Sequence, residues 1–122
     1  MSTWFPRLLG AATAAYGTAV TINPGFLAGP AGLAENGTTP RGTAVACRAV
    51  GIRDLISGAA MTTVTSPAAL RTAIAIRAAS DLGDAAVLGT SLPDKQARRR
   101  TGAIALSWGL LCGLSAATLK RR

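Results

Sequence analysis

The sequence contains no histidine, few aromatic residues and few acidic residues. Without histidine, neither imidazole acid–base catalysis nor an imidazole metal ligand is available. Two cysteines among 122 residues exclude a scaffold held together by disulfides. Aromatic residues make up only 4% of the chain, so the core of a water-soluble fold would contain few large side chains.

Apolar residues and positive charge are plentiful. Hydrophobic residues account for 49% of the chain, which excludes an intrinsically disordered protein. Thirteen lysines and arginines against five acidic residues give a formal charge of +8. The length of 122 residues is that of one domain.

Four long segments of low charge divide the chain, at about residues 4–22, 43–63, 67–90 and 101–119. Each is close to the ~20 helical residues that cross a bilayer core of ~30 Å. Alternation of polar and apolar residues with period two, which is typical of strands, is absent. The sequence therefore predicts an all-α bundle of four transmembrane helices that forms a single domain, residues 1–122.

Charges inside the second and third segments favour a different fold, a water-soluble helical bundle. A charged residue at the centre of a membrane helix costs about 2.5–3.5 kcal/mol on insertion scales, more than several leucines return. Neither segment would insert alone, whereas the fourth carries no charge over residues 101–119. A secretory signal cleaved near Ala14 is a third interpretation of the N-terminal segment. The membrane bundle accounts best for all four segments together.

Ionisable groups inside a membrane bundle normally face its interior and pair with one another. Because the turn at residues 64–66 is short, the second and third segments are expected to form an antiparallel hairpin. The sequence predicts that this hairpin buries a neutral polar network made of six charged residues: Arg48, Arg53, Asp54, Arg77, Asp81 and Asp84.

Counting residues away from the turn predicts the ion pairs. Asp54 lies level with Arg77, and Arg48 lies level with Asp81 and Asp84, so these are the expected partners. The network has two interpretations. It is either a structural device that sets the register of the helices, or a path or pocket for a proton, an ion or a small polar solute.

Arg53 lies roughly opposite Gly58 on the helical wheel, so it is expected to face a partner protein, a lipid headgroup or the first helix. Gly51 and Gly58 belong to a stripe of small residues, which lets a neighbouring helix approach closely. Gly109 and Gly113 form a GxxxG pattern for close crossing, either within the bundle or in a dimer.

Two basic clusters, residues 95–100 and 120–122, flank the fourth segment. They are best explained as anchors to anionic headgroups, because no interleaved aromatic residues indicate binding to nucleic acid. If the fourth segment spans the membrane, the two clusters lie on opposite faces of the membrane. The positive-inside rule then barely selects an orientation for the protein. Cys47 and Cys112 are expected to be small buried residues, and no cofactor or metal site is predicted.

Two charged motifs resemble a family of small four-helix bacterial integral membrane proteins that is defined only as a domain of unknown function. They are RAVGIRDLISG at residues 48–58 and RAASDLGD at residues 77–84. The resemblance covers most of the chain and implies four spans with interior charges. It implies no activity.

The sequence therefore predicts a small multi-pass protein of a bacterial plasma membrane. Its expected role is that of a non-catalytic accessory or interaction subunit, with the lipid bilayer and a homo-oligomer or larger membrane complex as partners. The alternative is a small transporter or channel that uses the buried arginines and aspartates as its path. Enzymatic activity is not expected, because no nucleophile or cofactor motif accompanies the paired carboxylates.

Overall fold

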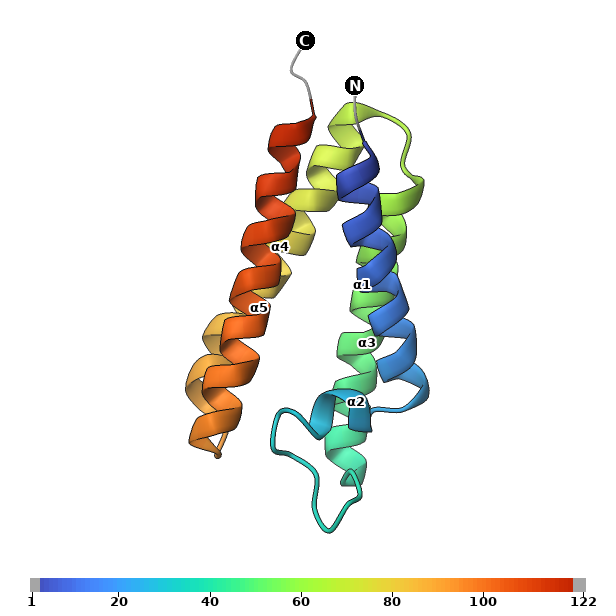
Figure 1. Ribbon diagram of the computed structural model, residues 1–122. Coiled ribbons are helices and arrows are strands. Elements are labelled where there is room, and N and C mark those ends of the chain that lie inside the picture. The colour runs from blue at the N-terminus through green and yellow to red at the C-terminus, as the bar shows by residue number, and fades with distance from the viewer. Residues whose placement is uncertain (1–2, 120–122) are drawn as a thin grey trace.

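The computed structural model describes residues 3–119, and within them the chain is helical, with no strand (Figure 1). Four long helices account for most of it, so the all-α class is confirmed. A single turn of α-helix and a 3₁₀ turn complete the fold. The elements are α1 (Trp4–Ile22), α2 (Gly25–Ala28), α3 (Arg41–Thr63), α4 (Pro67–Ser91), α5 (Lys95–Ser115) and η1 (Ala116–Thr118).

Helix starts follow from local capping. Ser66 accepts a hydrogen bond from the backbone N–H of Ala69, and Pro67 occupies the first turn of α4. The Asp94 carboxylate caps α5 in the same way, with 2.9 Å between its Oδ2 and the nitrogen of Ala97. This cap explains why α5 begins at Lys95, six residues before the predicted segment 101–119.

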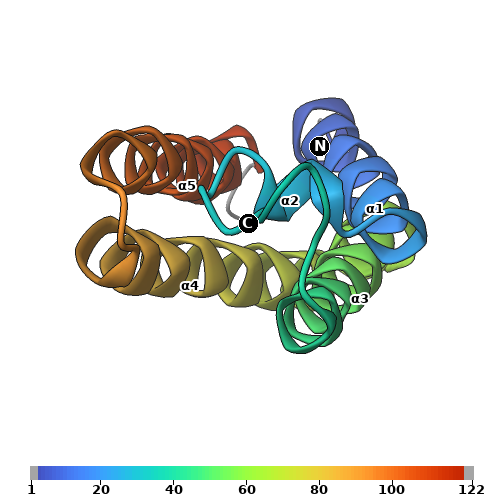
Figure 2. The same cartoon turned by 90° about the horizontal axis from the view of Figure 1, so that it is seen from below.

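The helices pack as two antiparallel pairs, α1 with α3 and α4 with α5 (Figures 1 and 2). The predicted α3–α4 hairpin exists in sequence, but these helices diverge from their connecting turn and share far fewer contacts than either pair. The reason lies in the small residues: the stripe containing Gly51 and Gly58 faces α1 rather than α4.

Backbone-to-backbone contact characterises the α1–α3 pair. A β-carbon on Gly17 would lie 2.4 Å from the carbonyl oxygen of Gly51, and one on Gly58 would lie 2.5 Å from the carbonyl oxygen of Gly10. At the end of α3, the Arg7 guanidinium of α1 donates hydrogen bonds to the carbonyls of Thr62 and Val64. Glycines and this arginine therefore hold α1 against α3 along its length.

The GxxxG pattern lies inside the second pair. A β-carbon on Gly109 would lie 3.0 Å from Cβ of Asp81, and one on Gly113 would lie 3.7 Å from Cβ of Ala78. Both glycines therefore face α4, which is the intrachain alternative of the two that the sequence left open.

One end of the molecule is closed by a hydrophobic cluster to which all four long helices contribute. Leu9 of α1, Met61 of α3, Ile74 of α4 and Cys112 of α5 are buried there, near the α3–α4 turn. At the opposite end, residues 25–33 cross from one helix pair to the other (Figure 2). This crossing segment, as we name residues 25–33, packs on both pairs: Ala28 on Val20 and Cys47, and Ala31 on Leu92 and Ala97.

Charged side chains are buried in the bundle together with its apolar core, and large apolar side chains are exposed on its surface. Arg77 is completely buried, whereas large apolar side chains on every long helix face outward. Ile22, Ile56, Ile76 and Leu114 are 75%, 65%, 56% and 70% exposed. By length and composition, however, one helical stretch among the described residues qualifies as a membrane span, Lys95–Thr118. That single stretch is weak support for a membrane protein.

Candidate functional site

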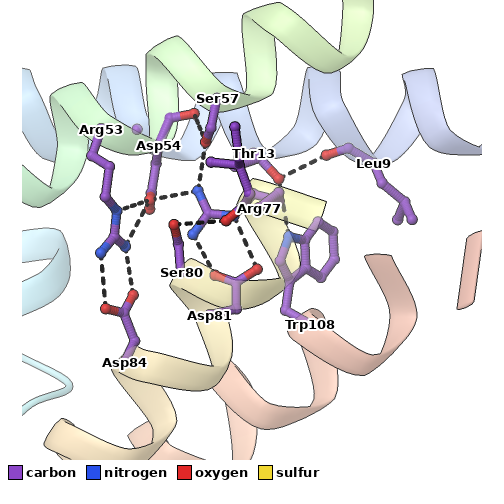
Figure 3. Close-up of polar contacts among 12 residues, drawn as sticks. Leu9, Thr13, Arg53, Asp54, Ser57, Arg77, Ser80, Asp81, Asp84 and Trp108 are labelled. Carbon is purple, nitrogen blue, oxygen red and sulfur yellow. Dashed lines mark hydrogen bonds and ion pairs between the residues drawn. The ribbon is translucent and has the colours of Figure 1, made fainter. Parts of the chain in front are cut away.

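Arg77 is the centre of a buried ionic network between α3 and α4 (Figure 3). Its Nε and Nη2 atoms form a two-point contact with the Asp81 carboxylate, at 3.0 and 2.5 Å. Its Nη1 atom lies 2.7 Å from Oδ1 of Asp54 and 2.7 Å from the hydroxyl of Ser57. The predicted Asp54–Arg77 pair is therefore present. Charge-assisted, two-point geometry of this kind gives the strongest hydrogen bonds that side chains form.

Arg53 extends the network towards the open part of the molecule. Its Nη1 and Nη2 atoms bind both oxygens of Asp84, at 2.9 and 2.5 Å, and Nη2 also lies 3.0 Å from Oδ1 of Asp54. The prediction that Arg53 faces a partner, a lipid or the first helix is therefore wrong. Asp54 Oδ1 joins the two guanidiniums, so that the order along the network is Asp84, Arg53, Asp54, Arg77, Asp81.

Arg48 does not belong to this network. Its Nε atom lies 3.2 Å from the carbonyl oxygen of Thr21, near the end of α1. The predicted pairing of Arg48 with Asp81 or Asp84 is wrong, because those carboxylates bind Arg77 and Arg53 instead. Because α3 diverges from α4, the part of α3 that carries Arg48 lies away from α4 and close to α1.

This difference between the two arginines can be measured. Arg48→Gln should change the free energy of unfolding by less than about 1 kcal/mol, because an exposed side chain loses one bond to a carbonyl. Arg53→Gln should cost about 1–2 kcal/mol, because two carboxylates lose a charged partner whose side chain is 35% exposed. Denaturant unfolding in detergent micelles measures both. Equal costs for the two variants would contradict this assignment.

A second polar contact ties α1 to α5 beside the network. The indole N–H of Trp108 donates to Oγ1 of Thr13 at 2.9 Å, and the Thr13 hydroxyl donates to the carbonyl of Leu9 at 2.8 Å (Figure 3). Because Thr13 is buried, this contact fixes the indole ring at the inner side of α5.

Beside the network, the two helix pairs border a partly open cavity of about 670 Å³. Arg53, Asp54, Asp81 and Asp84 line it at the network end, and Leu27 of α2 lines it at the end formed by the crossing segment. The rest of the wall is mostly apolar and comes from all four long helices. It consists of Ala12, Thr13, Tyr16, Val50, Ala79, Ser80, Gly83, Val87, Leu88, Thr101, Ile104, Ala105 and Trp108.

Sequence reasoning found most of the charged side chains of this site but not its other polar groups. Ser57 could have been found, because it lies one helical turn beyond Arg53 and shares a helix face with Asp54. No pattern in the sequence marks the remaining polar and aromatic groups, because their place on the cavity wall depends on how the two helix pairs lie relative to each other. These groups are Thr13, Tyr16, Thr101 and Trp108.

The side chains at hand limit the chemistry of this site. Among residues 3–119, no group of three or more carboxylates and cysteines is arranged to hold a metal ion. Cys47 and Cys112 are both buried and unpaired, in different hydrophobic clusters. Carboxylates already bound to guanidiniums suit electrostatic recognition better than acid–base catalysis.

No protein-family model, no curated protein and no solved structure matches this chain. The resemblance carried by the motifs at residues 48–58 and 77–84 therefore stays a prediction.

Proposed function

We propose that the chain is a four-span integral membrane protein of a bacterial plasma membrane that carries a small solute in its central cavity. The membrane part of this proposal rests on the distribution of polarity. Apolar side chains face outward from every long helix, while Arg77, Asp54 and Asp81 are buried. In water this arrangement would expose extensive apolar surface, whereas in a bilayer it places apolar groups against lipid.

Their charges make α3 and α4 poor membrane spans as isolated helices, but in the assembled bundle most of the inner charges are paired. Each of these helices carries four charged residues, which is why neither qualifies by composition. In the bundle, the innermost of these charges contact each other. Pairing lowers the cost of placing ionisable groups at membrane depth.

The cavity beside the ionic network is the single observation that favours a carrier. A volume of about 670 Å³ lies within the range of about 300–1,000 Å³ that is typical of small-molecule sites. One side of Arg53 and Asp84 faces this cavity, so a solute inside it would contact charged groups.

A non-catalytic accessory subunit is the second candidate. It is favoured by the two-point contacts of both guanidiniums, which leave the network largely satisfied without a ligand. Apolar surface on all four long helices would then meet a second copy of the chain or another membrane protein.

Site-directed cysteine labelling separates these candidates. Cys47 and Cys112 are first replaced by alanine, and single cysteines are introduced at Ala34, at Thr65 and at Ala105 on the cavity wall. We expect an impermeant thiol reagent to label Ala34→Cys from one side of the membrane and Thr65→Cys from the other. A small hydrophilic thiol reagent should reach Ala105→Cys through the cavity, but should not reach a control cysteine at the buried Ala73.

Labelling of Ala34→Cys and Thr65→Cys from the same side would overturn the four-span arrangement, since the connection between α2 and α3 and the turn between α3 and α4 lie at opposite ends of the bundle (Figure 1). Opposite-side labelling together with an inert Ala105→Cys would retain the membrane bundle and favour the accessory subunit over the carrier.

A further inference from the structure

The ionic network carries an excess of negative charge. Three carboxylates and two guanidiniums are joined in it, which gives a formal charge of −1 when all five groups are ionised. Arg48, which would have made the set neutral, binds the carbonyl of Thr21 instead. In surroundings of low dielectric constant, an uncompensated charge of this kind is costly and is relieved by a counterion or by a proton.

The excess charge faces the cavity. Asp54, Asp81 and Asp84 all line it, whereas Arg53 is the one guanidinium on the wall, since Arg77 lies behind the carboxylates. Among the residues on the wall no other side chain carries a formal charge. An entering ligand therefore meets more negative than positive charge at this end.

The remaining wall fits an organic body rather than a hydrated metal ion. Ca²⁺ and Mg²⁺ require about six or more oxygen ligands, and this wall offers few oxygen atoms besides its carboxylates, because most other lining groups are apolar. Tyr16 and Trp108 line the same cavity, and aromatic faces attract organic cations.

We propose that the cavity binds a small monovalent organic cation with an apolar or aromatic body. Its positive group would lie against Asp54 and Asp84, and its body would contact Tyr16 and Trp108. This inference rests on the proposed function and names the chemical class of the solute. Charge complementarity between the cation and the carboxylate-rich wall is the observation that carries it.

Three probes of matched shape test the proposal: (4-phenylbutyl)trimethylammonium, its neutral tert-butyl isostere, and 4-phenylbutylsulfonate. Binding is measured by titration calorimetry on the full chain in nanodiscs of zwitterionic lipid, with empty nanodiscs as the blank. We expect the cation to bind at least about tenfold more tightly than the neutral isostere, and the sulfonate to show no saturable binding.

Asp84→Asn removes the excess charge and leaves an amide oxygen that can still accept from Arg53. It should weaken cation binding by about tenfold and leave the affinity of the neutral isostere unchanged. Asp94→Asn is the matched control, because Asp94 caps α5 outside the cavity and asparagine caps helices equally well. Ala105→Phe, which places a ring in the cavity, should hinder binding of both the cation and its isostere.

The outcomes distinguish a failure of the cation inference from a failure of the proposed carrier function. If the neutral isostere binds as tightly as the cation, and Ala105→Phe hinders both, the cavity binds solutes but the inference of a cation is overturned. An apolar occupant such as a lipid acyl chain would then fit better. If no probe binds saturably, or if Ala105→Phe has no effect on binding, the cavity is not a solute site and the proposed carrier function fails as well.

Discussion

Replacing Arg77 with methionine should lower the free energy of unfolding more than any other single change in the network, by about 3–5 kcal/mol. Arg77 is completely buried and binds Asp54, Ser57 and Asp81. Methionine fills a similar volume, so the loss would come from electrostatics rather than from a void. Two buried carboxylates would be left with too little positive charge, and an unpaired buried charge is the most costly defect that one substitution can create.

The same substitution at Arg99 provides the control. Arg99 is exposed on α5, so Arg99→Met should change stability by no more than about 0.5 kcal/mol. Unfolding in mixed detergent micelles would measure both variants. The double variant Arg77→Met with Asp81→Leu should recover part of the loss, since it also removes one of the orphaned carboxylates. If Arg77→Met were as mild as Arg99→Met, the ionic network would contribute nothing to the fold.

Gly17→Ala should be the second most damaging change, despite adding a single methyl group. The new β-carbon would lie 2.4 Å from both the carbonyl oxygen of Gly51 and the nitrogen of Leu55. Both atoms belong to the backbone of α3 and cannot rotate away, so α1 and α3 would have to move apart. We expect a loss of about 1–3 kcal/mol or more, as is found when a tightly packed interface is overfilled.

Gly83→Ala makes this test specific. Gly83 lies inside α4, and a β-carbon there would meet no atom within 4 Å. Alanine favours a helix over glycine by about 1 kcal/mol, so this variant should be neutral or slightly more stable. Thermal unfolding should therefore show a large loss of stability for Gly17→Ala and none for Gly83→Ala. A Gly17→Ala protein as stable as Gly83→Ala would mean that α1 and α3 are not in backbone contact.

The sequence predicted the helices and the Asp54–Arg77 pair well, because both depend on short distances along the chain. Asp54 and Arg77 lie at similar distances from the short turn between α3 and α4, where these helices are still close together. Helical periodicity alone places side chains on a face with useful accuracy.

Arg48 shows where such reasoning fails. A helical wheel places Arg48 beside a small-residue stripe but does not say which neighbouring helix that stripe meets. Gly51 and Gly58 meet α1, so α3 turns away from α4 and Arg48 reaches Thr21. The cavity and the start of α5 were missed for related reasons. The cavity depends on how far the helix pairs diverge, and the basic residues after the Asp94 cap have the composition of a loop.

The division into two tightly packed pairs has a mechanical consequence. Each pair packs along its length, whereas the two pairs are covalently joined only through residues 64–66 at the closed end. Farther along, the ionic network and the Trp108–Thr13 hydrogen bond hold the pairs together. At the far end, the crossing segment joins them by apolar contacts and by the bond between Arg100 and the carbonyl of Pro30. A rotation of about 10° about residues 64–66 would shift α4 by about 4 Å at a point about 20 Å along it, which is the level of the ionic network. The network therefore resists any change in the angle between the pairs, and with it any change in the width of the cavity.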